Sequence, residues 1–359
     1  MATAAGDGGA HAAIADDLPA PPKRSFALSP GVVVDPGADC LYLMNPRGGI
    51  DAVALDSGRL LWSTPQGGKP LAVADDRLAS QGEPAHGALS LPILFLNARQ
   101  GRIESRAELP MPAGLMPPNI DDRLTTSSTV EARFETDGLL IAWRVTERQM
   151  SGLPRPMIVR EHAGGALIDL HTNRVTTLDA AQAEARMRAA TPPAPPRLAG
   201  SEGVYFAPQR VGQIFVSVKL GPASAEQPAT LKRWSATDGA PLPDIELGSG
   251  YVDSAISADH ALFLVVSRAS KSGASDRWSI YAVDTGRRVA ELRLGNAARP
   301  FFVWHSILIY VASPESRPAA TGSVEEPLRL RGLDMKTGTE LWKRALRNTS
   351  YTGSYPPHP

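Results

Sequence analysis

The chain has 359 residues, of which 43% are hydrophobic and 21% charged, and this is the composition of a soluble globular protein with a sizeable core. Its 37 basic and 37 acidic side chains cancel, so it lacks the positive excess that binding to a nucleic-acid backbone requires. Glycine and proline contribute 32 residues each, which argues against long helices and favours many short strands joined by turns.

Both ends of the chain are predicted to be flexible, over residues 1–24 and 351–359. The first segment has no basic start followed by an apolar block, so no signal peptide is predicted and the chain as written is expected in the cytoplasm. A periplasmic or extracellular location is the alternative if the N-terminus is processed. No stretch approaches 18 consecutive apolar residues, so no membrane span is predicted.

Between the ends, most of the chain is predicted to form β-strands. The clearest candidates are continuous apolar runs, which are typical of strands buried on both faces. In chain order they lie at 138–146, 212–220, 259–268, 278–284 and 305–313. Such strands require sheets that stack against other sheets on both sides.

Two segments interrupt the strand pattern and are predicted to be insertions. Residues 110–126 contain four prolines and read as irregular. Residues 178–190 are strong helix formers with Asp179 near the start, and the prolines within 191–196 end that helix. We therefore expect the second insertion to span 179–200 and to carry one helix.

One pattern recurs six times: an apolar strand, an Asp or Asn, a short polar turn that ends in Gly, and a second strand. The Asp or Asn is expected to cap the turn, and the Gly or its Asn equivalent to supply the positive φ that closes a hairpin. The repeat positions are Asp56, Gly58, Trp62, Asn97, Gly101, Asp169, Asn173, Gly239, Asp284, Gly286, Asp334, Gly338 and Trp342.

The spacing of these repeats predicts a β-propeller. Successive turn positions are 43, 72, 66, 47 and 52 residues apart, and the two long steps contain the insertions. A period of about 45–50 residues with four strands per unit is typical of propeller blades. We predict an all-β propeller over 25–350 with six four-stranded antiparallel blades, or seven if a long segment hides another. Residues 26–34 are expected to pair with strands near 327–347 and close the ring.

The run from Gly332 to Trp342 resembles the repeat of the pyrroloquinoline-quinone-like (quinoprotein-like) propellers, whose motif reads A-x-D-x-x-T-G-x-x-x-W. Residues 54–62 match this motif with the turn shortened by two. The resemblance implies that Trp62 and Trp342 dock between neighbouring blades. The catalytic branch of that family has eight blades, a quinone, a calcium ion and a disulfide between adjacent cysteines. A chain with the single Cys40 resembles instead the non-catalytic branch, which includes BamB-type proteins.

Few residues indicate chemistry. Cys40 lies in an apolar run and is expected to be a buried, inert thiol. The histidines form no i, i+4 pair, so no metal site is predicted, and His86 and His162 are placed in loops before third strands. Arg144, within an apolar strand, is expected to form a salt bridge at a blade edge, with a channel-lining role as the alternative.

The leading interpretation is a non-enzymatic scaffold for protein–protein interaction. The insertions 110–126 and 179–200 are the candidate partner surfaces, because the blades do not need them. No catalytic, cofactor-binding or metal-binding residue and no cofactor is predicted, and quinone-dependent dehydrogenase activity is disfavoured. The expected partner is another protein, not nucleic acid. The alternative is an enzyme or small-ligand-binding propeller with a site in the central channel.

Overall fold

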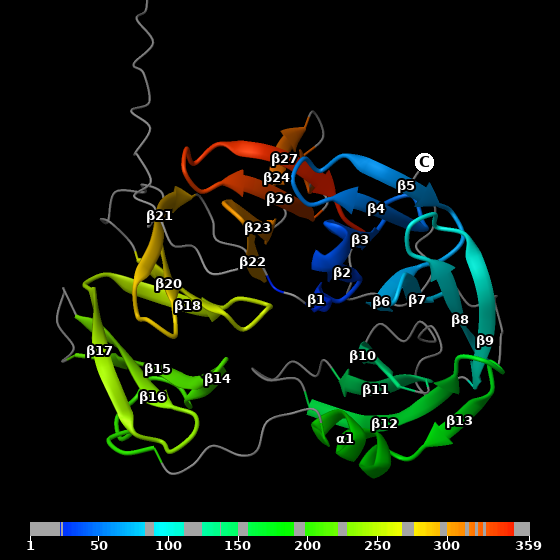
Figure 1. The fold of residues 1–359 in the computed structure, drawn as a ribbon, viewed down its shortest axis with the longest axis horizontal. Helices are drawn as coiled ribbons and strands as arrows, with labels where there is room; N and C mark the ends of the chain where they lie inside the picture. The colour runs from blue at the N-terminus through cyan, green and yellow to red at the C-terminus, as the bar shows by residue number, and fades with distance from the viewer. Residues whose placement is uncertain are drawn as a thin grey trace, which may run out of the picture. The chain divides into compact units, whose positions relative to one another are not determined.

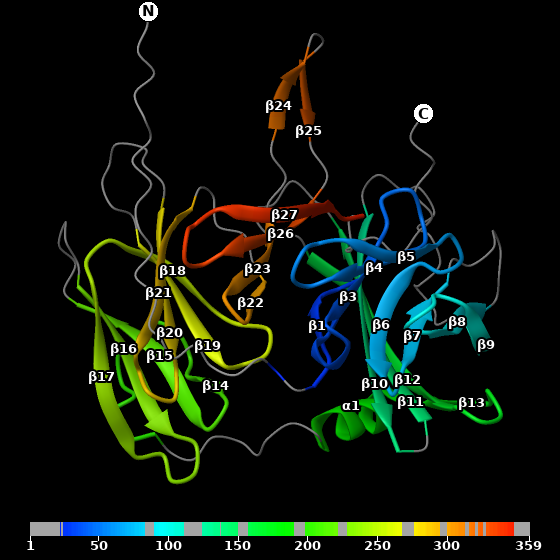
Figure 2. The same ribbon diagram turned by 45° about the horizontal axis from the view of Figure 1, so that its top comes forward.

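The computed structural model describes residues 22, 24–82, 90–110, 124–136, 138–149, 157–189, 198–221, 228–267, 276–294, 300–312, 316–319, 322–325 and 328–347. These residues form six antiparallel sheets, one separate hairpin and one α-helix (Figures 1 and 2). Almost all of the predicted arm 1–24, the middle of the insertion 110–126, the tail 351–359 and His86 lie outside the described residues.

The chain divides into two compact units. The first unit consists of Lys23–Leu55, Arg59–Pro192 and Ala345–Pro359. The second unit consists of Met1–Pro22, Asp56–Gly58 and Pro193–Arg344.

Three sheets and the helix belong to the first unit. The first sheet runs in the order β1 (Phe26–Ser29), β2 (Val32–Asp35), β3 (Cys40–Met44), β4 (Ile50–Ala54) and β5 (Leu60–Thr64). The second sheet runs in the order β6 (Lys69–Ala74), β7 (Arg77–Gln81), β8 (Ser90–Asn97) and β9 (Ile103–Pro110). The third sheet runs in the order β10 (Leu124–Glu135), β11 (Gly138–Gln149), β12 (Met157–Asp169) and β13 (Val175–Leu178), and α1 (Ala180–Ala189) follows it.

Three further sheets belong to the second unit. The fourth sheet runs in the order β14 (Gln209–Val211), β15 (Ile214–Leu220), β16 (Ala229–Ser235) and β17 (Pro241–Gly248). The fifth runs in the order β18 (Tyr251–Ile256), β19 (Leu262–Ser267), β20 (Asp276–Ala282) and β21 (Arg288–Leu294). The sixth runs in the order β22 (Phe301–Trp304), β23 (Ile307–Ala312), β26 (Arg329–Asp334) and β27 (Glu340–Ala345). The hairpin of β24 (Ser316–Ala319) and β25 (Gly322–Glu325) extends away from this last sheet (Figure 2).

The order of strands decides the fold class. Strands that follow one another along the chain are hydrogen-bonded neighbours in every sheet, apart from the inserted β24–β25 hairpin. Six consecutive antiparallel meanders, five of them four-stranded in the described residues, are the blades of a six-bladed all-β propeller. The predicted fold class is confirmed, with six blades among the described residues, and the predicted helix is α1.

The pairing expected for residues 26–34 is wrong. β1 pairs with β2, and β2 pairs with β3, so these residues extend the first sheet to five strands. The cause is the turn at Pro30-Gly31, where Gly31 has a φ of 79°. Proline followed by a residue with positive φ is the pattern of a type II turn, which folds the chain back on itself.

Burial on both faces explains the continuous apolar strands. β19 is the clearest case, because all of its residues are buried. Leu262, Leu264 and Val266 pack in the core shared with the sixth sheet. Phe263 and Val265 point to the opposite face and pack in the core shared with the fourth sheet. Because alternate side chains enter two different cores, the strand needs no polar face.

Candidate functional site

All six sequence repeats occupy the same place in their sheets, at the turn that joins the last two strands. In each turn the N–H of the first residue donates to the carbonyl oxygen five residues later. These bonds, 2.8–3.0 Å long, join Ala54 to Arg59, Asn97 to Arg102, Asp169 to Arg174, Ser235 to Ala240, Ala282 to Arg287 and Asp334 to Thr339. The turns therefore have equal length, and the shortened turn expected at 54–62 is wrong.

The Asp and Asn residues of the repeat do not all cap their turns in the same way. Asn97, Asp169 and Asp334 stand first in their turns, and each accepts a hydrogen bond from a backbone N–H two residues later, at 2.8–3.1 Å. In the other two turns the first residue is an alanine, Ala54 or Ala282. Asp56 and Asp284 stand two positions after these alanines, so they do not cap the turn in this way. The closing residue has a φ of 56–73° in all six turns; these residues are Gly58, Gly101, Asn173, Gly239, Gly286 and Gly338.

Two tryptophans lie against closing glycines. Trp62 on β5 packs against Gly101 in the turn of the second sheet, and its Nε1 donates to the carbonyl oxygen of Ala98 at 2.9 Å. A Cβ on Gly101 would lie 2.4 Å from Trp62 Cε3. Within the second unit, a Cβ on Gly58 would lie 2.6 Å from Trp342 Cγ. Each indole thus fills space that exists because the closing residue has no side chain.

Arg233 takes the place of a docking tryptophan between the fourth and fifth sheets. It is 6% exposed, and a Cβ on Gly286 would lie 2.7 Å from its Cζ. Its Nη1 donates at 3.1 Å to the carbonyl oxygen of Val283, which stands three residues before the glycine, as Ala98 does in its own turn. Burial lowers the pKa of Arg233 from its usual value. The sequence did not reveal this role, because the repeat has Pro243 at the tryptophan position.

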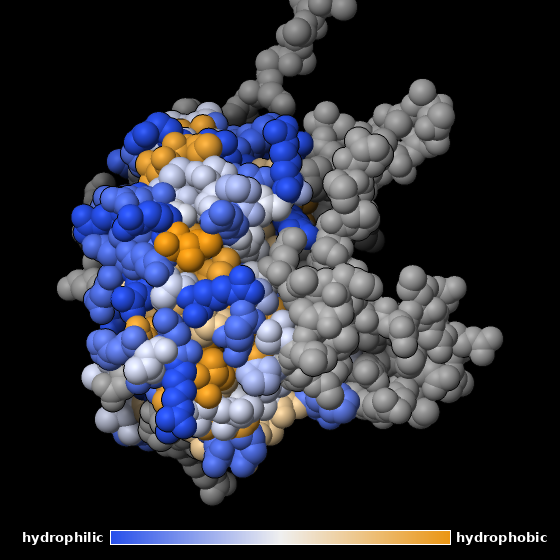
Figure 3. Space-filling view, turned by 90° about the vertical axis from the view of Figure 1, so that its right-hand side faces the viewer, coloured by the Kyte–Doolittle hydropathy of each residue, from blue (hydrophilic) through white to orange (hydrophobic). Residues whose placement is uncertain are grey.

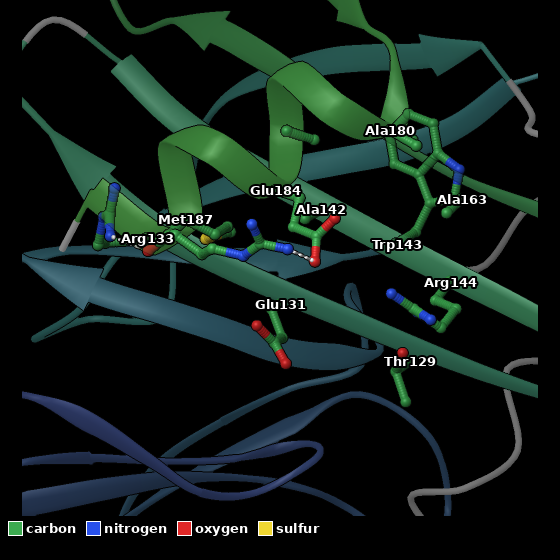
Figure 4. Close-up of a pocket in the computed structure, with 13 residues that line it drawn as sticks. Thr129, Glu131, Arg133, Ala142, Trp143, Arg144, Ala163, Ala180, Glu184 and Met187 are labelled. Atoms are coloured by element: carbon green, nitrogen blue, oxygen red, sulfur yellow. Dashed lines mark hydrogen bonds and ion pairs between the residues drawn. The ribbon is translucent and has the colours of Figure 1, made fainter. Parts of the chain in front are cut away.

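A cavity of about 530 Å³ lies between α1 and one face of the third sheet (Figure 4). This volume is within the range of ligand pockets. We call it the α1 groove. Its charged lining residues are Glu131, Arg133, Arg144, Glu184 and Arg188. Its other lining residues are Thr129, Ala142, Trp143, Ala163, Gly164, Ala180, Ala183 and Met187.

The register of the third sheet explains the polarity of the groove. Thr129 pairs with Arg144, and Glu131 pairs with Ala142, so these side chains share the face beneath α1. Ile141 points to the other face and packs in the core shared with the second sheet, and Trp143 belongs to the same core while it also borders the groove beside Gly164. The sheet therefore has one apolar face inside the fold and one polar face covered by the helix.

The N-terminal part of α1 is held by a capping box and a close contact. The backbone N–H of Gln182 donates to Asp179 Oδ1 at 2.8 Å, and the N–H of Asp179 donates to Gln182 Oε1 at 3.2 Å. In the middle of the helix, Ala183 lies on Gly165 of β12, where an added Cβ would be 2.5 Å from the Ala183 Cβ. Gly165 permits this approach because it has no side chain.

Arg133 on β10 holds the other end of α1. Its Nη2 donates to the carbonyl oxygen of Arg186 at 3.1 Å and to Glu135 at 2.7 Å, and its Nη1 donates to the carbonyl oxygen of Met187 at 3.4 Å. A cation at the C-terminal end of a helix is favourable, because it satisfies free carbonyl groups and opposes the helix dipole. The pattern of the sequence did not link Arg133 to the helix 50 residues later.

The groove arginines are paired with carboxylates. Arg144 pairs with Glu161 at 2.6 Å between β11 and β12, the two middle strands of the sheet, so the expected salt bridge forms but not at a blade edge. Arg188 pairs with Glu184 on α1. Glu131 has no hydrogen bond or ion pair within the part of the chain that the structure describes. In Figure 4 Glu131 lies between Arg133 on one side and Arg144 on the other, with its carboxylate turned away from α1.

The remaining sequence candidates lie apart from the groove. Cys40 is buried beside Tyr42, and burial raises the pKa of its thiol to about 11. His162 was expected in a loop, which is wrong, because it lies inside β12 opposite Val145. Among the described residues no three His, Cys, Asp or Glu side chains gather as a metal site, and none of their helices has the length and apolar character to cross a membrane.

Lys69 is a second residue that the sequence did not reveal. It starts β6 opposite Gln81, and both side chains are 5% exposed. Its ammonium has no hydrogen bond or ion pair among the residues that the structure describes. The Oε1 of Gln81 also lacks a partner there. Burial lowers the pKa of Lys69 from its usual value.

No protein-family profile and no curated protein matches the sequence. Among solved structures, the chain is similar to a eukaryotic initiation factor, with 10% identity and a TM-score of 0.39 over 92% of this chain and 89% of that chain. It is also similar to Hsv2 of Kluyveromyces lactis (9% identity, TM-score 0.35, 89% and 98% covered). A third is the dihydro-heme d1 dehydrogenase NirN in complex with DHE (12% identity, TM-score 0.34, 90% and 66% covered). Similarities at this level assign neither a family nor an activity, and the fold class rests on the strand order.

Proposed function

We propose that the chain is a non-enzymatic propeller scaffold that binds another protein, and that the α1 groove is its binding surface. The observation that carries the proposal is the way α1 is built onto the third sheet. Among the described side chains of α1, Ala183 alone is buried, and the others are exposed or half-buried. A helix that served only to complete a core would bury a full apolar stripe.

The polar face beneath α1 supports binding as the role of the groove. The helix is fixed at both ends, by the Asp179 capping box and by Arg133, so the cavity has rigid walls. The three arginines that line it are each held in an ion pair with a glutamate. Rigid walls with charges at fixed positions favour recognition of one partner, because little conformational entropy is lost when the partner binds.

We further propose that the chain is a divergent relative of the PQQ-like repeat propellers of the BamB type, with one domain over residues 25–350. Trp62 supports this proposal, because it docks on the closing glycine of the next repeat and donates to the turn carbonyl of Ala98. The same position in the sixth sheet carries Trp342, which lies against Gly58. Both contacts are those that the resemblance implies for the tryptophan of the motif.

The test is quantitative capture of partners from the native host by the full chain and two variants. Ala163→Trp places an indole in the groove, and the exposed Ala163 side chain has no core role. Ala181→Trp is the matched control, because Ala181 is exposed on α1 but does not line the groove. We expect wild type and Ala181→Trp to capture the same protein in stoichiometric amount, and Ala163→Trp to lose it. Equal capture by all three contradicts the groove as the binding surface.

A further inference from the structure

We infer that the α1 groove accepts a basic side chain, an arginine or lysine presented by a segment of the partner protein, with Glu131 as its counter-ion. The inference rests on the proposed function of the groove and adds the chemistry of the occupant. Its basis is the unequal pairing of charges around the cavity.

The cationic side chains of the groove already have anions. Arg133 contacts Glu135 and two carbonyl oxygens at the end of α1. Arg144 contacts Glu161, and Arg188 contacts Glu184. Together with these partners the three arginines contribute no net charge.

Glu131 is the carboxylate left over. It stands on β10 opposite Ala142, with Arg133 and Thr129 two residues away on the same strand face. Neither Arg133 nor Arg144 is within ion-pair distance of Glu131. Glu131 also has no other partner among the residues that the structure describes. Because each neighbouring arginine is engaged elsewhere, the groove presents one unbalanced negative charge.

The rest of the groove suits a long aliphatic stem that ends in a cation. Ala142 and Ala163 on the sheet and Ala180 on the helix are small, apolar members of its lining. Lysine and arginine bury their methylene groups along apolar surface while the charged head finds a polar partner.

A segment of a protein fills the cavity better than a lone amine does, because the cavity is larger than one side chain. About 530 Å³ is the volume of several residues. The main chain of the partner segment would lie across the rim of the groove, where the side chains of Arg144 and Glu161 are 56% and 43% exposed. On the face shown in Figure 3, the surface is mainly hydrophilic and its apolar patches are separate.

The experiment is selection of a random dodecapeptide library displayed on phage against the immobilised full-length chain, with Ala163→Trp as the counter-selection. Peptides retained by wild type and lost with Ala163→Trp are groove ligands. We expect them to share one Arg or Lys beside small or aliphatic residues. Glu131→Gln is expected to weaken the best of these peptides at least fivefold in fluorescence anisotropy, because a charge-assisted pair is lost.

Glu246→Gln is the matched control, since Glu246 is an exposed strand glutamate of the second unit without an ion pair among the described residues. It should leave peptide affinity unchanged. Glu131→Lys should reverse the preference, so that the peptide with Glu in place of its basic residue binds more tightly than the original.

The outcomes separate the two proposals. Groove ligands without a shared basic residue, or with a shared acidic one, overturn the inference and leave the groove as a binding surface. Basic peptides whose affinity is unchanged by Glu131→Gln overturn the role of Glu131. If Ala163→Trp retains every peptide that wild type retains, the groove binds none of them, and the proposed function fails together with the inference.

Discussion

The docking of Trp62 on Gly101 makes a specific prediction for alanine at this glycine. The residue has a φ of +69°, and alanine in the left-handed region costs about 1–2 kcal/mol. The new Cβ would also lie 2.4–2.8 Å from three atoms of the Trp62 ring, so the indole must retreat. Overpacking of this kind costs about 1–3 kcal/mol, and loss of the 2.9 Å bond to Ala98 costs about 0.5–1.5 kcal/mol.

Gly338 provides the matched control. It closes the corresponding turn of the sixth sheet with a φ of +71°, and a Cβ there would meet nothing within 4 Å. Gly338→Ala should therefore cost only the conformational part, about 1–2 kcal/mol. The difference between the two substitutions, about 2–4 kcal/mol, measures the tryptophan contact alone.

The assay is urea unfolding followed by circular dichroism on wild type, both alanine variants, and Gly101→Ala combined with Trp62→Ala. Removal of the indole should return the cost of Gly101→Ala to about 1–2 kcal/mol, because the clash partner is gone. Equal destabilisation by Gly101→Ala and Gly338→Ala, or the same cost of Gly101→Ala with and without Trp62, would refute the docking role.

Three more predictions concern buried groups. Arg233→Ala should lower the free energy of unfolding, measured in urea, by about 2–4 kcal/mol, because the carbonyl oxygens of Val283 and Pro243 lose their donor. Arg233→Lys should recover less than half of this loss, because an ammonium group lacks the planar arrangement of donors of a guanidinium. Above pH 9 wild type should lose stability relative to Cys40→Ala, by up to about 1.4 kcal/mol per pH unit until pH 11, because the folded thiol keeps its proton while the unfolded thiol loses it. Lys69→Met should raise the melting temperature at pH 7, and the gain should shrink as the pH rises toward 10.5, where the unfolded lysine also becomes neutral.

Each of these predictions has a contrary result. Full recovery by Arg233→Lys would show that a charge alone suffices at this position. Parallel pH curves for wild type and Cys40→Ala would show that the thiol titrates alike in both states. A lower melting temperature for Lys69→Met would show that the ammonium has a stabilising partner.

The fold was largely predictable because its determinants are local. Closing residues such as Gly101 and Asn173 mark the same turn in each sheet, and the Asp179 start and proline end of α1 are features of the neighbouring sequence. The hairpin at Pro30-Gly31 also has a local cause, because proline followed by glycine favours a type II turn, and this turn was not part of the prediction for residues 26–34.

The candidate site was less predictable because it depends on contacts between distant elements. The sequence predicts the insertion 179–200 as a candidate partner surface, but the groove itself exists because Gly165 admits Ala183 and Arg133 reaches the end of the helix. A glycine pair inside an apolar strand, here Gly164-Gly165, is the pattern that points to such a close approach. The isolation of Glu131 follows from the pairing of its neighbours, which no spacing in the sequence specifies.

The central claim is that the α1 groove holds a segment of a partner protein, and site-specific photo-crosslinking in the native host tests it most directly. A benzoylphenylalanine at Thr129, which lines the groove, is compared with one at Ala181, which does not. We predict a single crosslinked protein from position 129, attached through a peptide that contains arginine or lysine, and no such product from position 181. The same product from both positions, or none from position 129 when the partner co-purifies, would contradict the claim.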